Sequence, residues 1–173
     1  MIPLLILGLL KQNPGSYGYE LLALMKERHY KYIVNYTKGS FYYNLQQLEE
    51  KGYIENVEQT GNTRETNNYS ITKSGEKEFE KLMVLYGTKT DYINLSFYGA
   101  MLFTDEFKSE EVIKLIDVQI EQTKQKILLL QQSLEHDKTT SVYFRKMMEN
   151  SLSHHLVNLQ WFEELTKEMQ SNL

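Results

Sequence analysis

Two adjacent glutamines, Gln46 and Gln47, carry the side chains of this chain best suited to specific hydrogen bonding. A glutamine amide presents a donor and an acceptor side by side, and this pair matches the major-groove edge of adenine. At 100° per residue, a helix through them places Tyr43 and Glu50 on the same stripe. The stripe is a candidate base-reading face; the alternative is an ordinary solvated helix surface.

The opposite stripe of this segment is apolar. Phe41, Leu45 and Leu48 fall at i, i+4 and i+7, which predicts a helix packed on a core. Gly52 supplies a helix stop, and residues 53–58 switch to strand chemistry rich in β-branched and aromatic side chains. A helix that passes through a glycine into a hairpin is typical of a winged helix.

The segments on either side of this helix predict the other elements of the same domain. The apolar run 2–10 is too short to cross a bilayer and lacks the features of a signal peptide, so it predicts a buried first helix. A second helix is expected over 19–28, capped by Ser16. After the first strand, 69–72 is the expected return strand, and Thr72 or Ser74 the cap of the helix that follows.

Polar residues near the predicted helix start and the hairpin tip suit contacts to phosphate. Tyr42 lies near the helix N-terminus and is favoured as a contact, although it could instead pack on the second helix. Arg64, at the tip of the hairpin, could meet phosphate or enter a minor groove; the alternative is a solvated turn residue. The complete set of candidate DNA-binding residues is Lys38, Ser40, Tyr42, Tyr43, Gln46, Gln47 and Arg64.

Several separated motifs in residues 4–80 resemble the N-terminal domain of the PadR family of bacterial transcriptional regulators. They are Leu5-Ile6-Leu7-Gly8-Leu9-Leu10, Gly18-Tyr19-Glu20-Leu21, Gly39-Ser40-Phe41-Tyr42 with Leu45, Leu48-Glu49 and Gly52, and Tyr69-Ser70-Ile71-Thr72 with Gly75. The resemblance implies a winged helix-turn-helix DNA-binding domain, expected over 1–86. The chain departs from the family pattern at Tyr43, where proline is frequent, and in a less basic wing at 64–68.

The charge is unevenly distributed. The formal net charge is −4, yet residues 1–85 hold 10 basic and 10 acidic side chains, so the acidity lies in the second half. Between Lys11 and Leu48, Lys11, Lys26, Arg28, Lys31 and Lys38 face only two acids, which predicts a modest positive footprint. The chain has no cysteine, which excludes disulfides and agrees with a cytoplasmic protein.

The second half, 87–173, is expected to be an all-α helical hairpin that forms a coiled-coil dimer. A heptad seam runs along a long helix starting at Ser109, with Thr123 filling its one interrupted position, and a last helix is expected over about 142–169. The seam residues are Ile113, Ile116, Ile120, Ile127, Leu130 and Leu134. Residues 88–103 predict a shorter connecting helix. This half resembles the longer PadR subfamily, in which a helical C-terminal domain provides the dimer contact.

Aromatic residues are more abundant than a helical seam requires. The candidates for an effector pocket at a dimer interface are Tyr92, Phe97, Phe103, Phe144, Trp161 and Phe162, and ordinary core packing is the alternative. The resemblance implies effectors such as phenolic acids or other hydrophobic compounds.

No pattern for catalysis or metal binding stands out. His154 and His155 are adjacent, so on a helix they point about 100° apart and cannot form an i, i+4 metal pair. The expectation is therefore no enzyme, no metal and no cofactor. We expect a cytoplasmic homodimeric repressor that binds a double-stranded DNA operator with half-sites roughly 34 Å apart. The alternative is a winged-helix module that binds protein.

Overall fold

The computed structural model describes residues 1–57, 67–91, 93, 95–136 and 141–171. The chain divides into two compact units, Met1–Asp91 and Tyr92–Leu173. Each unit has its own apolar core. We describe each unit by itself.

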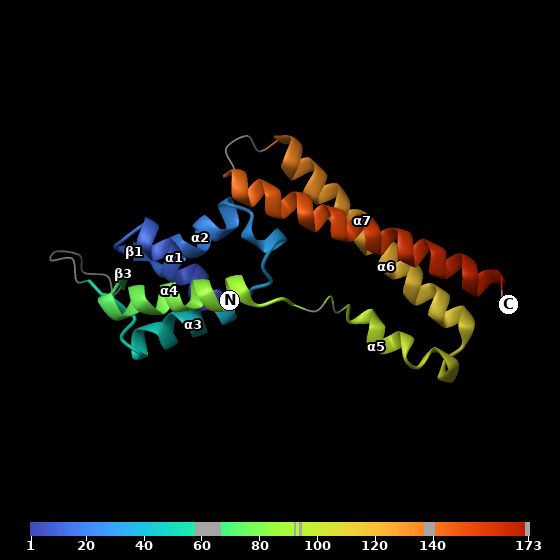
Figure 1. The fold of residues 1–173 in the computed structure, drawn as a ribbon, viewed down its shortest axis with the longest axis horizontal. Helices are drawn as coiled ribbons and strands as arrows, with labels where there is room; N and C mark the ends of the chain where they lie inside the picture. The colour runs from blue at the N-terminus through green and yellow to red at the C-terminus, as the bar shows by residue number, and fades with distance from the viewer. Residues whose placement is uncertain (58–66, 92, 94, 137–140, 172–173) are drawn as a thin grey trace. The chain divides into compact units, whose positions relative to one another are not determined.

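The first unit is a winged helix-turn-helix, as the sequence predicts (Figure 1). Its helices are α1 (Ile2–Gln12), α2 (Gly18–Glu27), the 3-10 turn η1 (Tyr30–Tyr32), α3 (Lys38–Glu50) and α4 (Lys73–Thr88). Its strands are β1 (Ser16–Tyr17), β2 (Ile54–Asn56) and β3 (Asn68–Ile71). They form an antiparallel sheet in the order β1-β3-β2.

Helix α1 lies at the centre of the first unit and buries four side chains. The core they join is formed by Ile6, Leu7, Leu9, Leu10, Leu21, Met25, Phe41, Leu45, Leu48 and Ile54, together with Tyr69 and Leu82. The predicted inward stripe of α3, Phe41, Leu45 and Leu48, is therefore confirmed as core. With that face buried, the other face of α3 is turned outward.

The start of α2 differs from the prediction that Ser16 caps it. Ser16 pairs with Tyr69 in the sheet, and Tyr17 is the N-cap residue. The backbone N–H of Tyr17 donates to the Glu20 carboxylate at 2.9 Å. The Ser16 prediction was wrong because a short strand forms where the sequence suggested a loop.

Helix α4 is tied to the turn that ends α3. Thr72 caps α4 as predicted, accepting from the Gly75 N–H at 3.1 Å. The Thr72 and Ser74 hydroxyls both donate to the Gly52 carbonyl oxygen, at 2.7 and 2.8 Å. Gly52 adopts a positive φ of 69°, which glycine accepts without strain. This clamp fixes the end of α3 against the start of α4.

The second unit is a helical hairpin with a short aromatic segment before it (Figure 1). Its elements are α5 (Phe97–Met101), the 3-10 turn η2 (Thr104–Glu106), α6 (Ser109–His136) and α7 (Val142–Ser171). Helices α6 and α7 pack against each other. The connecting helix predicted over 88–103 is reduced to α5: Thr88 is the last residue of α4, and the described residues 89–91, 93 and 95–96 are not helical.

The predicted seam of α6 lies largely inside this hairpin. Ile116, Ile127 and Leu130 are buried, and Thr123 is buried at the interrupted position. Val112 rather than Ile113 begins the buried stripe, because the turn before α6 brings Val112 under α5. From α7, the buried residues are Phe144, Met148 and Phe162. Within the described residues, no helix combines the length and apolarity that crossing a membrane requires.

Candidate nucleic-acid interface

Helix α3 begins with a capping box, which fixes its N-terminus. The Thr37 hydroxyl accepts from the Ser40 N–H at 3.1 Å, and the Ser40 hydroxyl oxygen accepts from the Thr37 N–H at 2.9 Å. Two of the amides that a helix start leaves unpaired are thereby satisfied. Ser40, predicted to contact phosphate, serves first as a structural cap.

The α3 N-terminus is nevertheless suited to an anion. The positive end of the helix dipole lies there, and the first turn holds no acidic residue. Lys38, the first helical residue, is exposed. A phosphate at this end would meet the helix dipole and a lysine ammonium together.

Tyr42 both packs and remains accessible. A Cβ atom on Gly18 would lie 3.2 Å from Tyr42 Cε1 and 2.9 Å from Leu45 Cδ2, so α2 and α3 approach closely only because residue 18 is glycine. Tyr42 is still 36% exposed, whereas its neighbour Tyr43 is 64% exposed. Tyr42 thus packs on the second helix, one of the two alternatives that the sequence left open, and its DNA contact stays a prediction.

Gln46 and Gln47 are joined through one carboxylate. Gln46 Nε2 donates to Glu50 Oε1 at 2.8 Å, and Gln47 Nε2 donates to Glu50 Oε2 at 2.7 Å. Gln46 and Glu50 are exposed, and Gln47 is half-buried. Sequence reasoning placed Glu50 on this stripe without giving it a role; the i, i+4 and i, i+3 spacings were the available signal.

The wing is described only in part. Arg64, the predicted phosphate contact at the hairpin tip, lies outside the described residues. At the near end of the wing, Asn56 Nδ2 donates to Asn67 Oδ1 at 2.8 Å across the two strands. On the same strand, the Tyr69 hydroxyl donates weakly to Glu49 of α3 over 3.4 Å, and burial raises the Tyr69 pKa.

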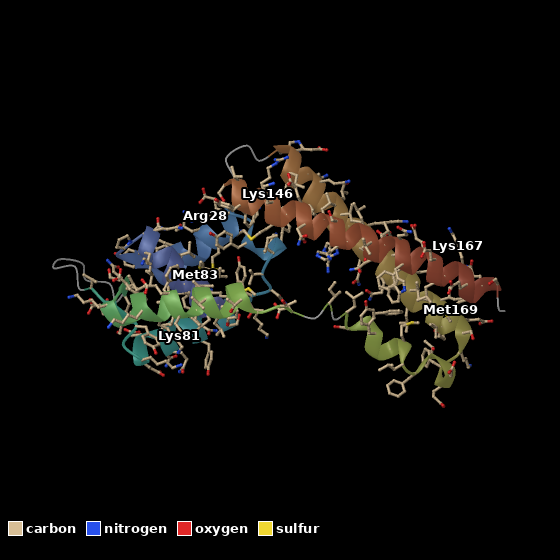
Figure 2. The ribbon with its side chains drawn as sticks, in the orientation of Figure 1. Arg28, Lys81, Met83, Lys146, Lys167 and Met169 are labelled. Carbon is tan, nitrogen blue, oxygen red and sulfur yellow. The ribbon has the colours of Figure 1, made fainter. Side chains whose placement is uncertain are left out.

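Three of the five bases counted as a positive footprint are engaged within the fold: Lys11, Arg28 and Lys31, whose ammonium lies over the ring of Tyr32. Lys11 lies 3.7 Å from Glu76 and over the ring of Phe79. Arg28 donates to Gln12 at 2.7 Å, and its side chain is labelled in Figure 2. This leaves Lys38 as the base best placed beside the α3 stripe.

The predicted effector residues do not form one group. Phe97 packs edge-on against Trp161 and Phe162, with ring centroids 6.3 and 5.3 Å apart. Phe144 is buried near the other end of α7; at about 1.5 Å per residue it lies roughly 25 Å from Trp161. Tyr92 lies outside the described residues. Phe97 and Trp161 therefore belong to one cluster and Phe144 to another part of the hairpin.

The histidines of α7 show a local electrostatic effect and no metal site. Burial lowers the pKa of His155, and the nearby Lys126 and His154 lower it further. Across the described part of the chain, His, Asp and Glu side chains form no group of three that could hold a metal ion.

Comparison with known proteins relates this architecture to regulators. Residues 6–81 match the family model described as the transcriptional regulator PadR-like family. No curated protein matches the chain significantly in sequence.

Three solved folds illustrate the likeness. The PadR-like transcriptional regulator BC1756 from Bacillus cereus is 20% identical, with 100% of both chains covered and a TM-score of 0.75. The Vibrio cholerae virulence activator AphA is 16% identical, with 100% of both chains covered and a TM-score of 0.80. Bacillus subtilis PadR with operator DNA is 20% identical over 96% of this chain and 98% of that chain, TM-score 0.73. The same PadR has also been solved with p-coumaric acid, again at 20% identity and a TM-score of 0.73, with 98% of each chain covered.

Proposed function

Residues 6–81 of this chain match the PadR-like family of transcriptional regulators, and from that premise we propose that the chain is a homodimeric, sequence-specific DNA-binding repressor of this family. The observation that carries the proposal is the outward face of α3 in a winged helix. Lys38 lies at the start of this helix, and the amides of Gln46 and Gln47 lie two turns further along it. Bacillus subtilis PadR, which shares the fold, has been solved with operator DNA.

Each part of α3 has a distinct role in this proposal. Lys38 and the helix N-terminus bind a phosphate and set the register on the duplex. The hydroxyls of Tyr42 and Tyr43 donate hydrogen bonds to the sugar-phosphate backbone of the DNA. Gln46 and Gln47 read base edges, with adenine the best match for an amide.

The proposed dimer rests on apolar surface outside the α6–α7 seam. Val118 and Leu129 are exposed and lie on one stripe of α6. Gln122 and Gln125 lie between them on the same stripe. Val157 on α7 is also exposed. A second copy of this chain would cover such a surface and place two α3 helices on half-sites about one turn, roughly 34 Å, apart.

Binding to duplex DNA from immediately upstream of the gene tests the function. Anisotropy titrations over a range of salt should give an affinity that falls with log-log slope of about −0.9 for each phosphate contacted. Scrambled duplex of equal length is the control and should bind more weakly. Absence of salt-dependent binding to either duplex would favour the alternative, a winged-helix module that binds protein. The intramolecular contacts of Lys11 and Arg28 support this alternative because they make these bases less available to phosphate.

A further inference from the structure

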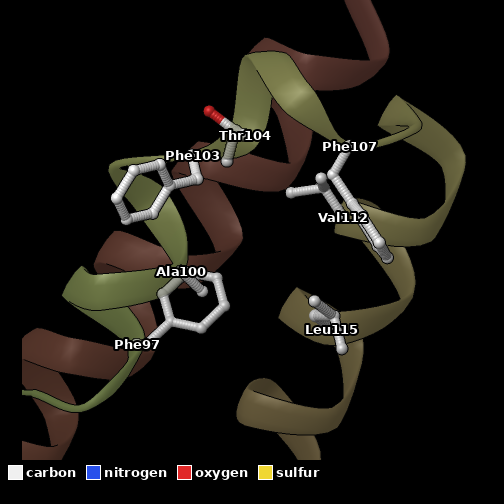
Figure 3. Close-up of a pocket in the computed structure, with 7 residues that line it drawn as sticks. All are labelled: Phe97, Ala100, Phe103, Thr104, Phe107, Val112 and Leu115. Atoms are coloured by element: carbon white, nitrogen blue, oxygen red, sulfur yellow. The ribbon is translucent and has the colours of Figure 1, made fainter.

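An open cavity of about 260 Å³ lies in the second unit, between α5, η2 and the first turns of α6 (Figure 3). All of its walls come from one compact unit. Its lining residues are Phe97, Ala100, Phe103, Thr104, Phe107, Val112 and Leu115. Of the predicted effector residues, Phe97 and Phe103 are among them.

The lining excludes a charged occupant. Thr104 is the one polar side chain in the wall, and its hydroxyl already donates to the Met101 carbonyl oxygen at 3.2 Å. None of the lining residues is charged. An ionised ligand would therefore lose hydration without gaining a partner.

The aromatic walls favour a flat ring. Phe103 and Phe107 are 65% and 55% exposed, so two large apolar rings border the cavity in contact with water. In Figure 3, Phe97 and Phe103 lie on the side formed by α5 and the residues just after it, and Val112 and Leu115 of α6 lie on the other side. A ring inserted between these sides would bury apolar surface.

The cavity adjoins the single tryptophan. Phe97 lines it and contacts Trp161 edge-on at 6.3 Å. Tyr98 contacts the same indole at 5.6 Å. A molecule in the cavity would touch the aromatic cluster that surrounds Trp161, so the indole emission reports its presence.

We propose that this α5–α6 cavity binds a small uncharged aromatic molecule of one or two rings. Binding rests on the cavity alone. The further step, that the occupant alters DNA affinity, rests on the proposed repressor function. A carboxylate such as a phenolic acid is a poor ligand for this cavity because no cation lines it.

A matched pair of probes tests the charge rule. 4-Nitrobenzyl alcohol and 4-nitrobenzoate share one ring and quench tryptophan, but only the second is charged at neutral pH. The alcohol should quench Trp161 saturably, with an affinity about tenfold or more above that of the carboxylate. Free tryptophan corrects for absorption and collisional quenching. Equal affinities, or quenching without saturation for both probes, would overturn the proposal.

A filling variant tests the location. Ala100 is exposed and lines the wall, so Ala100→Phe should occupy the cavity and abolish saturable quenching while the fold persists by circular dichroism. Leu102→Phe, which adds an aromatic ring to an exposed residue outside the lining, is the control and should bind as the wild type does. Unchanged binding by Ala100→Phe would place the site elsewhere. If Ala100→Phe instead converts a dimer to a monomer, a second copy covers this surface and the proposal fails.

A DNA-binding experiment distinguishes binding in the cavity from an effect of that binding on DNA affinity. Where operator DNA binds, saturating alcohol should change its affinity in the wild type and leave Ala100→Phe unaffected. Reciprocally, operator should shift the alcohol affinity by the same factor. Saturable binding with no effect on DNA affinity removes the regulatory step and keeps the cavity. Absence of DNA binding removes the proposed function, and the probe titration still decides the cavity.

Discussion

The Gln46 amide donates to the Glu50 carboxylate across 2.8 Å, one turn further along α3. Gln47 donates to the other oxygen of the same carboxylate. One anion therefore holds both amide nitrogens of the stripe proposed to read bases. Each amide keeps a second N–H that could donate to adenine, but the carboxylate restrains how the amide is oriented and would repel phosphate, so we expect Glu50 to weaken DNA binding.

Glu50→Gln should raise affinity for operator and for scrambled duplex several-fold at low salt, and the gain should shrink as salt screens it. Anisotropy titrations at two salt concentrations measure this. Glu80→Gln makes the same charge change at an exposed site on α4 and should have a smaller effect. Equal gains in both variants would mean that net charge, not the position of Glu50, governs the affinity.

Gln47→Ala should cost about 1–3 kcal/mol on the operator and little on scrambled duplex, because only base contacts carry sequence information. Lys38→Ala should instead weaken both duplexes alike and reduce the salt slope by about 1. The two variants differ in which duplex they affect, so competition titrations distinguish them. A uniform loss from Gln47→Ala would remove its base-reading role.

Gly75→Ala should destabilise the first unit by about 3 kcal/mol or more. A Cβ atom there would lie 1.9 Å from the Tyr53 carbonyl oxygen, a backbone atom held in the clamp at the start of α4. Gly87→Ala, in the same helix with open space around it, should be neutral or up to about 1 kcal/mol more stable. Urea unfolding of the two variants checks both values.

Leu129→Asp should yield a folded monomer, whereas Ile127→Asp should unfold the second unit. The first side chain is 45% exposed and the second 8%, although they lie two residues apart on α6. A buried unpaired charge costs far more than an exposed one. Light scattering and circular dichroism together separate these outcomes. A folded Leu129→Asp dimer would show that the copies meet through another surface.

The second unit should lose stability as pH falls below about 6.5, the unperturbed histidine pKa. Burial, Lys126 and His154 lower the folded-state pKa of His155, so the unfolded chain binds its proton more readily. Stability is then complete above the unfolded pKa and decreases toward the folded pKa. His155→Gln should flatten the thermal midpoint between about pH 5.5 and 7.5. A wild-type midpoint that stays constant over this range would contradict the expectation.

Periodicity predicted the parts of the fold that bury one face. Phe41, Leu45 and Leu48 could be read as core because their spacing allows only one inward stripe. Thr123 could be placed in the α6 seam for the same reason. Spacing did not reveal that the seam would be filled by α7 of the same chain, since identical apolar stripes suit either partner.

The features that the sequence did not predict depend on long-range pairing and on side-chain geometry. Ser16 carries a capping side chain, yet its pairing with Tyr69 depends on a strand more than fifty residues away. The α5–α6 cavity arises from a short helix and a 3-10 turn, which have no extended period to recognise. The i, i+4 and i, i+3 spacings allow Glu50 to accept from both glutamines, but the sequence does not show which side-chain rotamers form these hydrogen bonds.

The hydroxyls of Thr72 and Ser74 share the Gly52 carbonyl oxygen, and so the last turn of α3 and the first turn of α4 have one common anchor. A rotation of α3 by itself would break both hydrogen bonds. Helices α3 and α4 are therefore held together as one rigid pair. Any movement of α3 within the first unit should therefore carry α4 with it.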